Sequence, residues 1–315
     1  MVKRGKSGVA ARGKLESILA RTRLSGFQET LAGYVFTAPA LMTVSLFMLL
    51  PILSSFVLVF MEYDILTPPR WAGLSNITRL FGDRRMMVTY WNTFRFALGA
   101  TFLNNLLGLL LAMGVNRAMP RVLKYLLRTA LFFPAMTTVS SLALVWHFIL
   151  TLDRGIMNYL LQQIGLPAVP WLTSQRWALP SLIMFDVWRA CGYLMILYLA
   201  GLQGIPKILY EAAMIDGANR WQLRRYVTLP QITPTAFFCI TISLINAFQL
   251  FDNAWVLTEG GPHDASRLVV LYVYEVAFRR FEMGYASAVS LSLFALVVGV
   301  TLLQFWGARK WVHYD

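Results

Sequence analysis

Residues 211–218 read Glu-Ala-Ala-Met-Ile-Asp-Gly-Ala, and residues 227–230 read Val-Thr-Leu-Pro. This polar stretch lies between two long apolar segments of a 315-residue chain in which 57% of residues are hydrophobic and only 14% are charged. Soluble domains of this length are less apolar, so we expect the chain to lie in a bilayer. The polar stretch is then the part of the chain best placed to meet a partner protein.

Six apolar segments, each with few or no charges, are long enough to cross about 30 Å of hydrocarbon as helices. They cover residues 34–60, 94–115, 130–152, 178–201, 237–257 and 283–306. Their length and their Leu, Ala, Val, Phe and Met content favour helices over the short alternating strands of a membrane barrel. The sequence therefore predicts an all-α protein with six transmembrane helices, in which residues 32–315 form the transmembrane domain.

The distribution of Lys and Arg predicts the orientation, because basic residues near span ends stay on the cytoplasmic side. With the N-terminus inside, the inner segments carry 17 of the 28 basic residues and the outer ones nine. We therefore expect an inner-membrane protein with both termini in the cytoplasm. The net charge of +13 then reflects topology and some attraction to anionic membrane lipid, and no nucleic-acid partner is expected.

Residues 1–31 form a basic N-terminal tail that we expect to be cytoplasmic. Its apolar residues are scattered, so a cleavable signal peptide is not expected. Leu15, Ile18 and Leu19 suit a short amphipathic helix on the membrane surface.

Residues 206–230 are predicted to form a helical hairpin between the fourth and fifth spans. A first helix can begin at Pro206 and run through Ile215, after which Gly217 permits a left-handed backbone. Asn219 is a suitable N-cap for a second helix over residues 220–227, which Pro230 would end. The small residues of the first helix would let another protein close around it, although a solvated connector would have similar spacing.

Two charged residues fall inside the fourth span, where each costs about 2.5–3.5 kcal/mol on insertion scales. Asp186 and Arg189 are three residues apart, so they can pair on one face of the helix. We favour this pairing over direct contact with a substrate, because it relieves the cost without a ligand.

The fifth span carries a polar stripe. Asn246, Gln249 and Asp252 recur at three-residue steps, with Phe248 and other aromatic residues among them. Amides and carboxylates can bind hydroxyl groups and rings can stack on a sugar, so these residues are candidates for a substrate path. Hydrogen bonding to a neighbouring subunit is the alternative.

The chain carries no recognisable catalytic or metal site. Cys191 and Cys239 fall inside predicted spans, and His147, His263 and His313 are isolated in sequence. Gly5-Lys6-Ser7 lacks the first glycine and the preceding strand of a phosphate-binding loop. We therefore expect no enzyme and no cofactor on this chain.

Residues 211–230 resemble the signature loop of permease subunits in binding-protein-dependent ABC importers. That loop reads Glu-Ala-Ala, three residues, Gly, nine residues, Ile, one residue, Leu-Pro, and this chain departs from it only at Val227. Weaker matches to the maltose-type first permease of the carbohydrate branch run along most of the chain. They are residues 71–76 (Trp-Ala-Gly-Leu-Ser-Asn), Asn92-Thr93, Gly155 with Asn158, Trp171-Leu172, residues 258–262 (Thr-Glu-Gly-Gly-Pro) and residues 283–288 (Met-Gly-Tyr-Ala-Ser-Ala).

This resemblance implies a carbohydrate importer in which the chain pairs with a second, related permease as a heterodimer. Two ATPase subunits would bind ATP and Mg, and an external solute-binding protein would deliver the sugar, with a disaccharide or glycoside as the favoured cargo. The hairpin would be the coupling helix seated in a cleft of one ATPase. The coupling residues implied are Glu211, Ala212, Ala213, Asp216, Gly217, Ala218 and Arg220.

An ion-coupled carrier or channel is the alternative from another functional class. Such a protein places titratable groups or broken helices at mid-membrane. Asp186, His147 and Asp252 are the strongest candidates here, and they form no convincing relay.

Overall fold

The computed structural model describes residues 30–117 and 119–312, so the N-terminal tail and its expected amphipathic helix lie outside the described residues. The chain divides into two units, Met1–Val57 and Leu58–Asp315. A long apolar helix begins at Thr30 in the first unit and ends at Leu58, the first residue of the second unit. It includes η1 (Ser45–Leu49) and α2 (Leu50–Leu58). Its most apolar window has no buried residue. Such a surface needs lipid or another protein around it.

The second unit is almost entirely helical. Its only sheet among the described residues is the antiparallel pair of β1 (Met61–Glu62) and β2 (Arg70–Trp71). The helices are α3 (Ser75–Gly82), α4 (Arg84–Val115), α5 (Arg121–Met136), α6 (Val139–Leu150), α7 (Ile156–Gln163), α8 (Ala178–Gly204), α9 (Lys207–Ile215), α10 (Arg220–Gln222), η2 (Leu223–Thr228), α11 (Leu229–Gln231), α12 (Thr233–Phe248), α13 (Asp252–Thr258), α14 (Val269–Tyr274), η3 (Glu275–Arg279) and α15 (Met283–Ala308).

Four helices are long and apolar enough to span a membrane, and two bent helix pairs raise the number to six if each pair is one span. The four continuous helices confirm the predicted first, second, fourth and sixth spans. The predicted third span is wrong as a straight helix, because α5 and α6 meet at 99°. Pro134 lies near the end of α5, and Thr137 and Thr138 then adopt extended backbone. A proline cannot donate the hydrogen bond that would continue the helix.

The fifth span is displaced toward the N-terminus relative to its prediction. α12 ends at Phe248, and the chain is irregular at Leu250 and Phe251 before α13 begins. At the N-terminal side of this span, the prediction that Pro230 ends the second hairpin helix is wrong. The helix continues through Pro230 because η2 is a π-helix, in which the Leu229 N–H donates to the carbonyl of Arg224 five residues earlier. The path bends by 60° only between α11 and α12.

The stretch 266–281 precedes the last long helix, α15. It is helical over α14 and η3, and α14 packs against α4 and α15 with Val269, Leu271 and Tyr272 buried. One face of the segment therefore belongs to the core.

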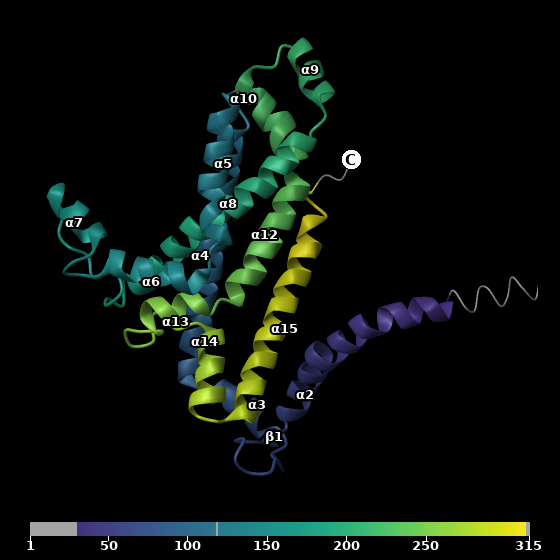
Figure 1. Cartoon of the computed structure of the whole chain (residues 1–315), viewed down its shortest axis with the longest axis vertical. Helices are drawn as coiled ribbons and strands as arrows, with labels where there is room; N and C mark the ends of the chain where they lie inside the picture. Colours follow the sequence, from purple (N-terminus) through teal and green to yellow (C-terminus); the bar gives the residue numbers. More distant parts are fainter. Residues whose placement is uncertain (1–29, 118, 313–315) are drawn as a thin grey trace, which may run out of the picture. The chain divides into compact units, whose positions relative to one another are not determined.

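The core of the bundle is built on α8, which packs against α4 and α5 (Figure 1). Small residues allow these helices to approach closely. A Cβ at Gly192 of α8 would lie 1.8 Å from the carbonyl oxygen of Leu131 in α5, and one at Gly108 of α4 would lie 2.9 Å from the Cβ of Leu194. At the end of α8 that leads into the hairpin, a Cβ at Gly201 would lie 2.3 Å from the hydroxyl oxygen of Thr235, so α8 and α12 are also closely packed there.

The α5–α8 contact predicts that Gly192→Ala destabilises the protein. Overpacking a closed helix contact costs about 1–3 kcal/mol, which lowers the midpoint of thermal unfolding in detergent. Gly204→Ala is the matched control on the same helix, because a Cβ there meets nothing within 4 Å. An unfolding midpoint equally unchanged in both variants would contradict this packing.

Candidate functional site

The hairpin between α8 and α12 begins with α9, which the Pro206 N-cap precedes and Asp216 ends. Gly217 adopts a left-handed backbone with φ of 82°. The Ala218 N–H donates to the Ala213 carbonyl at 2.9 Å, and the Gly217 N–H donates to the Met214 carbonyl at 3.1 Å. These two bonds form a Schellman motif, which satisfies carbonyls that a helix end leaves free. The predicted glycine turn is confirmed as backbone geometry.

The second arm begins at Asn219, whose side chain accepts from the backbone N–H groups of Trp221 and Gln222 at 3.0 and 2.9 Å. Gln222 Oε1 accepts in return from the Asn219 N–H at 2.8 Å, which completes a capping box. The hydroxyls of Tyr210 and Thr228 lie 3.0 Å apart and join the two arms. The predicted N-cap is confirmed. The capping box stabilises the turn of the hairpin, and the Tyr210–Thr228 bond joins its two arms at the base.

The hairpin exposes apolar side chains although it is not a membrane span. Ile215 is 86% exposed and Ile208 is 70% exposed. Glu211 and Ala212 are also exposed, whereas Ala213 is half-buried. Figure 1 shows α9 and α10 extending beyond the ends of the long helices. Apolar groups gathered on a projecting polar loop are typical of a protein contact. The remaining implied coupling residues are Asp216, Gly217 and Arg220, which are exposed, and Ala218, which is half-buried.

A buried polar junction joins α4, α8 and α13 around Asp186, which is 6% exposed. Its carboxylate accepts from Asn104 Nδ2 at 2.9 Å and from Asn253 Nδ2 at 3.3 Å. Arg189 lies 3.5 Å away, which confirms the predicted pair. The two amides are the closer partners, so the charge is stabilised mainly by helices other than its own.

Sequence reasoning missed Asn104 and Asn253 in this junction. Both are buried, and the Oδ1 atom of each has no hydrogen-bond partner among the described residues. Asn104, Asp186 and Arg189 line a cavity of about 60 Å³ that also borders Asn246 of α12. The available signal was an asparagine pair at 104–105 inside an otherwise apolar span, since buried amides need partners.

The predicted stripe on the fifth span is divided by the structure. Asn246 is exposed on α12, Gln249 is exposed just after the end of α12, and Asp252 begins α13. Phe248 is 2% exposed and belongs to the core. A single helical face therefore does not hold all four residues, because the backbone is irregular between α12 and α13. Asn246 is the member of the stripe that borders the cavity near Asp186.

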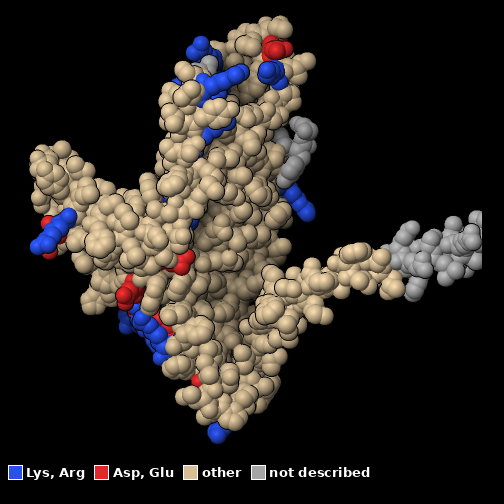
Figure 2. Space-filling view, viewed as in Figure 1, with Lys and Arg blue, Asp and Glu red and all other residues tan. Residues whose placement is uncertain are grey.

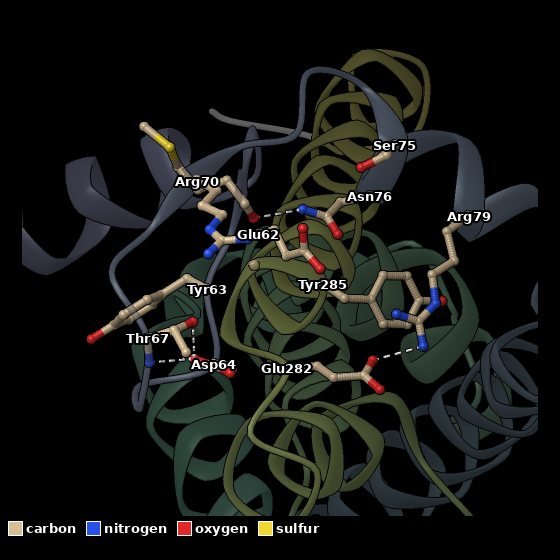
Figure 3. A pocket seen from close by; sticks show the side chains of 12 residues that line it. Glu62, Tyr63, Asp64, Thr67, Arg70, Ser75, Asn76, Arg79, Glu282 and Tyr285 are labelled. Carbon is tan, nitrogen blue, oxygen red and sulfur yellow. Dashed lines mark hydrogen bonds and ion pairs between the residues drawn. The ribbon is translucent and has the colours of Figure 1, made fainter.

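At the opposite end of the bundle, a polar cap brings together sequence motifs about 200 residues apart. Asn76 donates to the carbonyls of Val59 and Met61, each at 2.9 Å. A Cβ at Gly284 would lie 2.0 Å from the same Met61 carbonyl, so only glycine allows this approach. Figure 3 shows Asn76, Arg79 and Tyr285 around the resulting pocket of about 490 Å³.

Next to this pocket, Asp83 is the N-cap of α4 and accepts hydrogen bonds from the hydroxyls of Tyr272 and Tyr285 at 2.5 and 2.6 Å. Burial disfavours the charged carboxylate, but these bonds outweigh it and hold the pKa of Asp83 below its usual value. Burial, together with the bond to Asp83, raises the pKa of Tyr272 to about 12. At neutral pH Asp83 is therefore charged and Tyr272 is neutral.

The geometry defines a polytopic helical membrane protein with a projecting, hydrogen-bonded hairpin at one end and a polar cap at the other. Residues 104–312 match the family described as binding-protein-dependent transport system inner membrane component. The chain belongs to this family of multi-pass, non-catalytic ABC permease subunits of the inner membrane.

Curated relatives match over most of their length. A probable ABC transporter permease protein, YesP of Bacillus subtilis (strain 168), is 36% identical over 91% of this chain and 94% of its own. The lactose transport system permease protein LacF of Rhizobium radiobacter is 35% identical over 88% of this chain and 94% of its own. The trehalose/maltose permease protein MalF of Thermococcus litoralis is 30% identical over 88% of this chain and 93% of its own.

A solved structure supports the fold. A chain of a bacterial ABC transporter involved in the import of the acidic polysaccharide alginate has a TM-score of 0.80 and 23% identity. The match covers 92% of this chain and 99% of that chain. The same helical architecture therefore occurs in a known importer.

The capping box predicts that Asn219→Ala loosens the hairpin. Loss of an N-cap costs about 1 kcal/mol, so the amides of residues 221 and 222 should exchange hydrogen more rapidly in the variant. Gln203→Ala is the control, because Gln203 is exposed near the end of α8 and caps no helix. Unchanged exchange at both amides in Asn219→Ala would contradict the cap.

Proposed function

We propose that this chain is the permease subunit of an ATP-driven importer that carries a carbohydrate, with a disaccharide or glycoside as the cargo. The observation that carries the proposal is the hairpin, a rigid, apolar-tipped projection with the signature spacing of this transporter class. The names of LacF and MalF support a sugar as the cargo. With the N-terminus and the C-terminus in the cytoplasm, the hairpin faces the compartment that contains ATP.

The coupling role follows from how the hairpin is attached. α9 follows α8 after Ile205 and Pro206, and the second arm leads through α11 into α12. A force applied at the tip therefore reaches two bundle helices at once. We propose that Ala212, Ala213 and Ile215 fill a cleft of an ATPase subunit and that Glu211 and Arg220 make charged contacts at its rim. Closure of the ATPase pair would then tilt the bundle as a rigid body.

The remaining partners follow from exposed surfaces. The apolar helix from Thr30 to Leu58 has no buried window, which suits contact with lipid and with a second, related permease. The polar outer cap lies where an external solute-binding protein would deliver the sugar. ATP and Mg belong to the ATPase subunits in this proposal.

The substrate path is proposed to pass beside Asn246 and Gln249, with Asp252 at its outer continuation. The cavity beside Asp186 and Arg189 is about 60 Å³, which is smaller than the roughly 300 Å³ at the lower end for ligand pockets. The second permease would therefore complete the path. Phe248 is assigned a packing role because it is buried.

The coupling proposal predicts that Glu211→Lys abolishes ATP-coupled uptake and weakens co-purification of the ATPase, because the charge at the contact is reversed. Gly217→Pro should have the same effect, since proline cannot adopt a φ near 82°. Membrane insertion should remain intact in both variants.

Glu62→Lys is the matched control for the charge reversal, because Glu62 is exposed at the outer cap. It should leave ATPase co-purification unchanged. Full uptake by both hairpin variants would refute the docking role.

The path proposal predicts that Asn246→Ala or Gln249→Ala changes the order of preference among competing sugars in uptake assays. A lost hydrogen bond to a hydroxyl is worth about 0.5–1.5 kcal/mol, which corresponds to roughly a twofold to thirteenfold change in relative affinity. Gln163→Ala, at an exposed position of α7, is the control. Loss of the complex with the second permease, with preference unaltered, would instead assign these residues to the subunit interface.

A further inference from the structure

The end of the bundle that carries the hairpin has a strongly basic surface. Figure 2 shows Lys and Arg side chains gathered there, with few acidic ones. Among the described residues, the basic side chains of this end form no ion pair. They are Arg117, Arg121, Lys124, Arg128, Lys207, Arg220, Arg224 and Arg225. Cations without acidic partners at a membrane boundary attract anions.

Two of these arginines line a single cavity of about 440 Å³. Asn116 and Arg117 reach it from the end of α4, and Arg224 and Thr228 reach it from the second arm of the hairpin. Tyr210 of α9 completes the polar lining. The hydroxyls of Tyr210 and Thr228 lie 3.0 Å apart and bond to each other, so they hold the polar wall of the cavity in place while the arginines supply the N–H donors. This set of side chains is suited to a phosphate group, because arginine binds phosphate oxygens through paired N–H donors.

The other wall of the cavity is apolar. Leu110, Met113 and Leu202 line it. Leu110 is 54% exposed. The apolar surface continues along α4 over Leu106 and Leu103, which are 41% and 37% exposed. Residues at i, i+3 and i+7 share one helical face. A ligand with a phosphate and a hydrocarbon chain therefore fits this site better than a free anion does.

We propose that this cavity binds the phosphate headgroup of an anionic membrane lipid, with an acyl chain along Leu103, Leu106 and Leu110. The site joins the hairpin to the end of α4, so a bound lipid would stabilise the hairpin against the bundle. The inference rests on the proposed function for the placement of this end at the inner leaflet. Free phosphate compounds share the headgroup chemistry and are separated from lipid by the test below.

The test uses the full transporter, purified with its partners into nanodiscs that contain phosphatidylglycerol and phosphatidylcholine. Native mass spectrometry counts the phosphatidylglycerol molecules retained. Arg117→Gln and Arg224→Gln should each lower retention about fivefold, since each arginine contributes to attraction of the headgroup. Arg224→Lys keeps the charge and should retain more lipid than Arg224→Gln.

Arg309→Gln is the matched control, because Arg309 is exposed and does not line the cavity. Its retention should equal that of the unmodified protein. Equal retention in all of these variants would overturn the proposal. Binding of inorganic phosphate alone, with phosphatidylglycerol retention insensitive to both arginines, would also overturn it.

Lipid retention is measured without transport, which separates this inference from the coupling proposal. Normal retention in Glu211→Lys, together with lost uptake, would support both proposals. Retention that fails to depend on Arg117 and Arg224, while uptake still depends on Glu211, would refute only the lipid site.

Discussion

The absence of water from the bilayer interior is the constraint on which this structure depends. Each backbone N–H and C=O inside the hydrocarbon must find a partner within the protein, which restricts the spans to helices. Helices can bend only where other groups replace the missing bonds. Near the bend after α5, the hydroxyl of Thr137 accordingly donates to the carbonyl of Phe133 at 3.2 Å.

The hairpin lies outside the bundle, so local hydrogen bonds, and not packing against the long helices, hold its shape. Its turn is fixed by the Gly217 bonds and its second arm by the Asn219 capping box. The Tyr210–Thr228 contact closes its base. These bonds join residues no more than 18 positions apart. The shape of the hairpin is therefore determined within the hairpin itself and does not depend on a bound partner.

This locality explains what could be predicted from the sequence. The bounds of α9, the left-handed turn at Gly217 and the cap at Asn219 depend on neighbouring residues, and all were predicted correctly. The Asp186 junction depends on Asn104 and Asn253, which are 82 and 67 residues away. The asparagine pair at 104–105 stands out in an apolar span, but no local pattern shows that Asp186 is its partner. The α5–α6 bend and the continuation through Pro230 were also missed, because hydropathy measures length and composition but not the hydrogen bonding along the helix.

We propose that the hairpin moves as one rigid body between an ATPase subunit and the bundle. The most direct measurement is the distance between spin labels at Ile208 and Tyr226, two exposed positions on its opposite arms, in the assembled transporter with and without ATP. The account predicts the same narrow distance distribution in both states. A distance that changes with nucleotide would contradict it.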